Sequence, residues 1–209
     1  LIPLIEHKPS DEKPEGFIKK TLGYGWKAPL SKILAFINYK ADIFLANLFL
    51  GPAAVGIYVI AVALAEKLWL MSQAVSTVVL PRLAQLSSDE AKRKQLTPLI
   101  ARWVLLSTLV VALMVAAIAV PLIGAVFGSD YLEAVIPLWI LLPGIVLTSA
   151  SRVLANDIAA RGRPELNMYT SIVVVVVNII GNLILIPVYG LPGAAAATTI
   201  AYTLNLVLR

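Results

Sequence analysis

Seven ionisable side chains interrupt the hydrophobic segments of this chain: Lys32, Lys40, Asp42, Glu66, Lys67, Arg152 and Asp157. A charge near the centre of a bilayer costs about 2.5 to 3.5 kcal/mol on insertion scales, so it usually marks a pathway or a paired structural contact. The chemistry that these residues offer is recognition of charged groups inside a membrane. Lys40, Glu66 and Lys67 lie about midway along their segments and are the first candidates to line a cavity.

Helical geometry separates these charges. Lys40 and Asp42 are about 200° apart around a helix, so both can face one cavity only if the helix is deformed. Otherwise one of them pairs with a neighbouring helix. Asp157 precedes Arg161 by one turn near a segment end, which favours a surface ion pair at spacing i,i+4.

Polar residues form stripes at helical spacing on five of six segments. The stripes are Ser31, Asn38 and Asp42; Glu66, Gln73 and Thr77; Thr148, Arg152 and Asn156; Asn167, Ser171, Asn178 and Asn182; and Thr198, Tyr202 and Asn205. They indicate a bundle around a hydrated cavity. They are equally typical of interhelical hydrogen bonds, worth about 0.6 kcal/mol each on average. The remaining segment, the third, is predicted to face lipid.

The composition indicates that membrane-spanning helices position these residues. Hydrophobic residues make up 59% and charged residues 14% of the 209 residues, and mean hydropathy is +0.87. A membrane span needs about 20 apolar residues. We therefore expect an all-α polytopic transmembrane bundle with a linker or interfacial segment at 1–27 and a six-span lobe at 28–209. The predicted spans are 28–50, 53–81, 98–127, 134–160, 166–188 and 192–209, separated by Gly- and Pro-containing breaks.

Basic residues gather at alternate boundaries between these spans. They are Lys13, Lys19, Lys20 and Lys27; Arg82, Lys92, Arg93, Lys94 and Arg102; and Arg161 and Arg163. The turns at 50–53, 128–133 and 187–193 contain neither Lys nor Arg. Lys and Arg accumulate in cytoplasmic loops. This distribution predicts a cytoplasmic N-terminal linker and three turns on the outer side.

Several classes of function are disfavoured. The chain has no Cys, and its one histidine, His7, lies in the polar tail. It lacks a P-loop, a Gly-rich dinucleotide motif and a zinc-protease motif, so we expect neither an enzyme nor a cofactor or metal site. The net charge of +5 is explained by topology rather than by nucleic acid. The chain starts without Met and ends after an apolar run, so we expect a fragment of a longer polypeptide.

Short motifs in order along residues 30–209 suggest a family. They are Lys40-Ala41-Asp42, Leu50-Gly51-Pro52, Val55-Gly56-Ile57-Tyr58, Leu80-Pro81-Arg82-Leu83, Phe127-Gly128-Ser129-Asp130-Tyr131, and Asn178 to Asn182 continuing to Ala195. Together they resemble the second half of polysaccharide and O-antigen flippases, in the multidrug/oligosaccharidyl-lipid/polysaccharide (MATE-like) exporter superfamily. The order and spacing carry this resemblance, because each motif alone is short and apolar.

The resemblance implies the C-terminal lobe of a two-lobe transporter in a bacterial or archaeal cytoplasmic membrane. It implies that an undecaprenyl-pyrophosphate-linked glycan is flipped across the bilayer by alternating access. The partners would be that glycan, the lipid bilayer and the missing N-terminal lobe, in the same polypeptide or a partner chain. Lys40, Lys67, Arg152, Asn178 and Asn182 would then bind substrate. Asp42 and Glu66 would couple transport to protons or sodium.

Other functions stay open at this point. A drug/cation antiporter of the same superfamily would favour carboxylates in its cavity. The candidate cavity residues here comprise three basic and two acidic side chains, a balance that favours an anionic substrate only weakly. A peptidoglycan-precursor flippase cannot be separated on charge. A membrane glycosyltransferase or ligase would need carboxylates in a surface loop, and the outer turns offer only Asp130 and Glu133 together. A purely structural subunit is a further alternative.

Overall fold

The computed structural model describes residues 27–70, 72–75, 77–78 and 90–209. The predicted linker, including His7, lies outside these residues apart from its last position, Lys27. The side chains of Ser31, Lys32 and Asn38 are likewise outside the described part of the chain.

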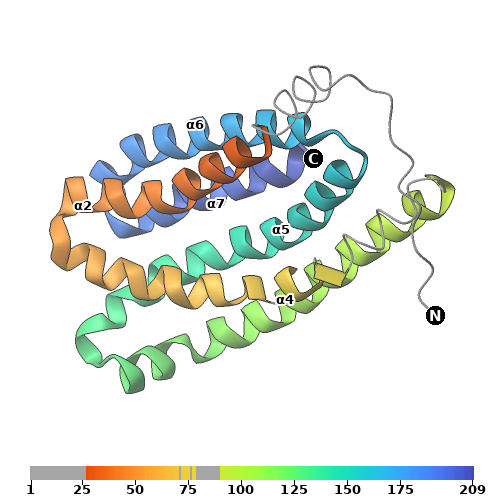
Figure 1. The fold of residues 1–209 in the computed structure, drawn as a ribbon. Coiled ribbons are helices and arrows are strands. Elements are labelled where there is room, and N and C mark those ends of the chain that lie inside the picture. Colours follow the sequence, from red (N-terminus) through yellow and green to blue (C-terminus); the bar gives the residue numbers. More distant parts are fainter. Residues whose placement is uncertain (1–26, 71, 76, 79–89) are drawn as a thin grey trace, which may run out of the picture.

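Every element assigned within the described residues is helical (Figure 1). In chain order they are α2 (Lys27–Lys67), α4 (Glu90–Val126), the 3₁₀ helix η1 (Ser129–Ala134), α5 (Val135–Ala160), α6 (Pro164–Tyr189) and α7 (Leu191–Val207). Four segments are long and apolar enough to cross a membrane: 40–75, 95–126, 129–160 and 164–189. The predicted all-α, multi-pass membrane protein is confirmed.

The first predicted span and residues 53–67 of the second form the two arms of α2, which bends back on itself at Gly51 (Figure 1). Gly51 has φ 82° and ψ 173°, a backbone conformation that glycine adopts without the steric strain that a Cβ would introduce. Pro52 follows and has no N–H to continue the hydrogen-bond ladder. The predicted break at Gly51-Pro52 is therefore a tight turn between two helical arms.

The predicted end of the second span, residue 81, lies outside the described residues. The start of α4 differs from the predicted start of the third span. This helix begins at Glu90 instead of 98 and runs through Pro98. Hydropathy marks where a helix enters the apolar layer, whereas backbone hydrogen bonds continue through the charged residues before it. The turn expected at 128–133 contains η1, which begins directly after Gly128.

The helices pack as a bundle in which α7 lies against both α5 and α6, and α2 lies against α6 and α5. Small residues permit this close packing. A Cβ on Gly144 of α5 would lie 2.9 Å from the Cα of Thr199 in α7. The Thr199 hydroxyl donates a hydrogen bond of 2.6 Å to the carbonyl oxygen of Ile140 across the same contact. Close approach through small residues is how membrane helices gain packing energy without a hydrophobic driving force.

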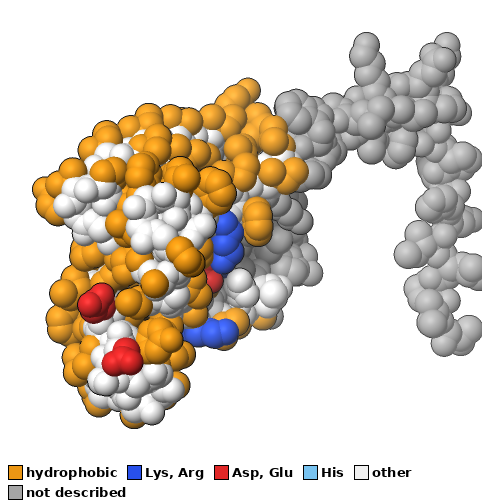
Figure 2. Space-filling view, turned by 90° about the vertical axis from the view of Figure 1, so that its left-hand side faces the viewer, with side chains coloured by type: hydrophobic (Ala, Val, Ile, Leu, Met, Phe, Trp, Pro, Cys, Tyr) orange, Lys and Arg blue, Asp and Glu red, His pale blue; other side chains and the backbone are white. Residues whose placement is uncertain are grey.

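Helix α4 lies at the edge of the bundle, where it packs against α5 and η1. In its most apolar stretch 17% of the residues are buried, against 72% in the corresponding stretch of the span that contains α5. Trp103, Leu113 and Val126 are among its exposed hydrophobic side chains. The third segment thus has an apolar outer surface, as the prediction that it faces lipid requires. Figure 2 views the bundle from the end where α2 bends back, and hydrophobic side chains are spread over that face.

Gly144→Ala should lower the thermal unfolding midpoint of the purified protein in detergent micelles, followed by tryptophan fluorescence. The added methyl group must separate α5 from α7, and overpacking of this kind costs about 1 to 3 kcal/mol. Gly56→Ala is the matched control, because a Cβ there meets nothing within 4 Å. Equal midpoints for the two variants would contradict the tight α5–α7 contact.

Candidate functional site

The carboxylate of Asp42 is buried inside the bundle and accepts three hydrogen bonds. The Tyr58 hydroxyl donates to its Oδ2 at 2.8 Å and the Thr198 hydroxyl donates to the same oxygen at 3.2 Å. The backbone N–H of Ile43 donates to Oδ1 at 2.8 Å. Tyr58 lies on the second arm of α2 and Thr198 on α7, so one carboxylate links both arms of α2 to α7.

The hydrogen bonds continue from Thr198 into α6. The Asn178 amide nitrogen donates to the Thr198 hydroxyl at 3.4 Å. The Asn182 amide nitrogen donates to the Asn178 side-chain oxygen at 3.2 Å and to its backbone oxygen at 2.8 Å. We call these five buried residues, Asp42, Tyr58, Asn178, Asn182 and Thr198, the Asp42 network.

The Asp42 network lies deep in the predicted membrane layer. At a rise of about 1.5 Å per residue, Asp42 is about 13 Å along α2 from Gly51, and Thr198 is about 12 Å along α7 from Gly190. The hydrocarbon core of a bilayer is about 30 Å thick, so both residues lie near its middle. A carboxylate at this depth is tolerated only with compensating donors, and Tyr58 and Thr198 provide them.

Lys40 points away from Asp42, as their separation around the helix predicts. Its Nζ lies 3.9 Å from Oε1 of Glu66, and the side chains are 47% and 30% exposed. This ion pair spans the two arms of α2. Lys67, the neighbour of Glu66, is exposed. Two predicted site residues, Lys40 and Glu66, are thus brought together, but outside the Asp42 network.

Arg152 lies in an aromatic cluster next to the Asp42 network. Its guanidinium group is 4.3 Å from the ring centroid of Trp69, a cation–π contact between α5 and the helix that continues α2. The Trp69 ring lies 6.0 Å from that of Tyr202 in α7. Tyr202 is one helical turn from Thr198 along α7. The cluster that holds Arg152 is therefore adjacent to the Asp42 network but is not part of it.

The predicted pair between Asp157 and Arg161 is confirmed. Nη2 and Nε of Arg161 lie 2.7 Å and 2.8 Å from Oδ2 of Asp157. The pair was expected at the surface, yet Asp157 is buried. Its burial depends on how the chain packs around it, which helical spacing does not encode.

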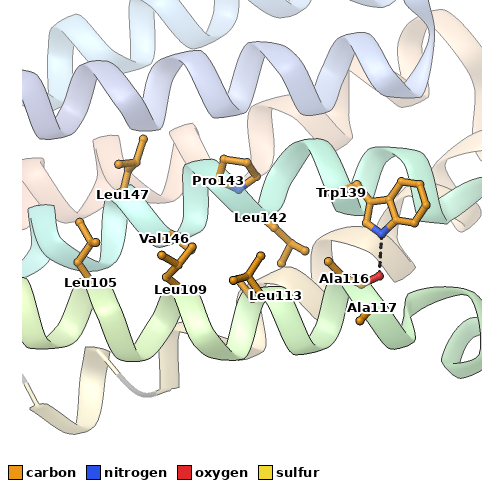
Figure 3. Close-up of a pocket in the computed structure, with 11 residues that line it drawn as sticks. Leu105, Leu109, Leu113, Ala116, Ala117, Trp139, Leu142, Pro143, Val146 and Leu147 are labelled. Carbon is orange, nitrogen blue, oxygen red and sulfur yellow. Dashed lines mark hydrogen bonds between the residues drawn. The ribbon is translucent and has the colours of Figure 1, made fainter.

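Some neutral polar residues make interhelical contacts and do not line a cavity. The Asn167 amide donates to the backbone oxygen of Ala155 in α5 at 2.9 Å. A cavity of about 730 Å³ between α4 and α5 is apolar, with Leu109, Leu113 and Val146 among its lining residues (Figure 3). Trp139 at its edge donates to the backbone oxygen of Ala116 at 3.0 Å. The Asp42 network lies in packed protein and forms no wall of this cavity.

Sequence reasoning did not single out Tyr58 or Trp69 as site residues. A signal for Tyr58 was present, because Asp42 and Tyr58 lie at similar distances on either side of Gly51. A chain that folds back at Gly51 brings these two positions to the same depth. Trp69 carries no comparable signal, since its contact with Arg152 depends on how α5 packs against α2.

Tyr58→Phe should lower the thermal unfolding midpoint in micelles, because it removes one donor from a buried carboxylate. Hydrogen bonds to charged groups contribute about 1.5 to 3 kcal/mol. Tyr189→Phe is the control, since the Tyr189 side chain is exposed. If both variants unfold at the wild-type midpoint, the hydroxyl of Tyr58 does not hold the two arms of α2 together.

Comparisons with known proteins find similarity to proteins of polysaccharide biosynthesis and to membrane transporters. Residues 2–136 match a family model described as polysaccharide biosynthesis protein. A probable low-salt glycan biosynthesis flippase, Agl15 of Haloferax volcanii, is 30% identical over 194 residues, which are 91% of this chain and 41% of that protein. A crystal structure of the Vibrio cholerae MATE transporter VcmN in the bent form superposes with a TM-score of 0.77 at 19% identity.

The structural match covers 92% of this chain and 45% of VcmN. At that sequence identity the likeness establishes the fold alone, that of a MATE-like transporter lobe. The chain spans less than half the length of either protein.

Proposed function

This chain belongs to the polysaccharide biosynthesis protein family, and we propose that it is one lobe of a transporter that flips lipid-linked glycan precursors across a cytoplasmic membrane. The observation that carries the proposal is the Asp42 network, a buried ionisable site shared by α2, α6 and α7 near mid-membrane. Transporters commonly bind substrate and coupling ions at this depth, between helices that rearrange. The flippase name of the Haloferax volcanii relative supports the choice of a glycan substrate.

In this proposal Asp42 binds the coupling ion, a proton or sodium. Oδ2 of Asp42 accepts hydrogen bonds from both Tyr58 and Thr198. A bound cation competes for the lone pairs that these donors use, because an ionised carboxylate is an acceptor only. Ion binding therefore changes how firmly the two arms of α2 are held to α7. Glu66, paired with Lys40 across the same arms, is the second proposed coupling residue.

The proposed substrate is anionic, an undecaprenyl pyrophosphate carrying the glycan. Lys40, Lys67 and Arg152 supply the cationic groups that would bind it. Asn178 and Asn182 are fully buried in this conformation. Their predicted contact with substrate therefore requires α6 and α7 to separate during the transport cycle. No step in this cycle needs a covalent catalyst.

We further propose that the predicted topology holds, with the N-terminal linker cytoplasmic. The bend at Gly51 and the turns at Gly128 and Gly190 lie at one end of the bundle, and the α5–α6 turn with its arginines lies at the other (Figure 1). The basic end would then face the cytoplasm. A second lobe would supply the opposite wall of the substrate cavity.

Asp42→Asn should abolish stimulation of glycan flipping by a proton or sodium gradient while leaving the protein folded. The measurement is translocation of a fluorescent lipid-linked oligosaccharide by the full-length protein in proteoliposomes, with and without each gradient. Asp130→Asn is the control, because Asp130 is exposed in a terminal turn. Gradient stimulation that survives in Asp42→Asn would exclude Asp42 as the coupling residue.

Lys40→Ala and Arg152→Ala should each slow translocation at subsaturating substrate by about tenfold to a hundredfold, since a charge-assisted contact contributes about 1.5 to 3 kcal/mol. Arg102→Ala removes an exposed charge from α4 and should have little effect. Unchanged rates in both cavity variants would argue strongly against a cationic binding site. Export of a cationic drug in place of the glycan would favour an antiporter.

A further inference from the structure

Arginines gather in a pocket at the end of the bundle that contains the α5–α6 turn. The pocket has a volume of about 450 Å³, and its lining includes Arg161, Arg163, Arg209, Tyr169, Leu166 and Leu208. The lining of this pocket therefore combines cationic and aliphatic side chains. The cavity between α4 and α5, by contrast, has an almost wholly apolar lining.

The residues that line the pocket include three arginines and one carboxylate, that of Asp157. Asp157 binds Arg161 at 2.7 Å, and Glu165 lies 3.8 Å from Nε of Arg163. Nη1 of Arg209 lies 3.4 Å from the backbone oxygen and from the hydroxyl of Ser151. The Arg163 side chain is 63% exposed, so its fork of donors is accessible to a ligand.

The surroundings of the pocket match the edge of a membrane. Residues 161–163 connect two membrane-crossing helices, so the arginines lie where the chain leaves the apolar layer. Tyr169 is exposed less than two turns into α6, and tyrosine is enriched at the membrane–water interface. Helix α6 begins with Pro164 beside Arg163, and the positive end of the helix dipole adds to the local charge.

We propose that this pocket binds the phosphate headgroup of an anionic membrane lipid, with the acyl chains along the aliphatic wall formed by Leu166 and Leu208. Basic pockets between membrane helices bind phosphate headgroups through such contacts, and the arginine fork matches phosphate geometry. The assignment of the lipid to the cytoplasmic leaflet rests on the proposed topology. The binding itself does not depend on glycan transport.

The test is binding of dioleoylphosphatidylglycerol to the purified full-length protein in an uncharged detergent, measured by native mass spectrometry and by thermal unfolding. Phosphatidylglycerol should bind and raise the unfolding midpoint, whereas dioleoylphosphatidylcholine and inorganic phosphate should not. A phosphatidylcholine shift equal to that of phosphatidylglycerol would overturn the proposal. So would an equal shift from inorganic phosphate, which would identify a free-anion site.

Arg163→Gln should weaken phosphatidylglycerol binding about fivefold, the factor that corresponds to about 1 kcal/mol per interfacial arginine. Arg163 is the preferred target, because removing Arg161 would leave buried Asp157 without its ion pair. Arg102→Gln removes one exposed charge elsewhere and should leave binding unchanged. Equal affinities for wild type and Arg163→Gln would contradict the proposal. Glycan flipping is measured separately in the same preparations. Failure of the lipid-binding proposal can therefore be distinguished from failure of the proposed flippase function.

Discussion

A carboxylate in the middle of a membrane bundle must find hydrogen-bond donors within the protein, and most of the architecture depends on how Asp42 meets this requirement. Its donors come from Tyr58 and Thr198, on two different helical segments. The chain can supply Tyr58 only by turning back at Gly51, and Thr198 only by packing α7 against α2. The contact of Gly144 with Thr199 lets α7 approach α5 closely on its other side.

Much of the fold could be predicted because membrane helices have simple requirements. Long apolar runs identified the membrane-crossing segments. Gly51 and Gly190, which both have positive φ, marked breaks between helical segments. The opposite directions of Lys40 and Asp42 followed from helical periodicity alone. The asparagines of α6 stood out because amides in an apolar stretch need partners.

The rest depended on which helices meet, and that information is not local. The pairing of Lys40 with Glu66 requires the hairpin formed by the two arms of α2. The stacking of Arg152 on Trp69 requires α5 to pack against the continuation of α2. Hydropathy also missed the true start of α4 at Glu90, since helical hydrogen bonding extends beyond the apolar layer. Polar periodicity alone could not tell residues that line a cavity from residues buried in contacts.

The order of donors in the Asp42 network gives it a direction. Asn182 donates to Asn178, Asn178 donates to Thr198, and Thr198 donates to Asp42, so each link points toward the carboxylate. The Thr198 hydroxyl has a single hydrogen, which it can give to only one neighbour at a time. If Asp42 became a donor toward Thr198, the Thr198 oxygen would accept from Asp42 and Asn178 together, and its own hydrogen would have to turn to a different acceptor. Protonation of one carboxyl group on α2 would then change the hydrogen bonding of a hydroxyl on α7.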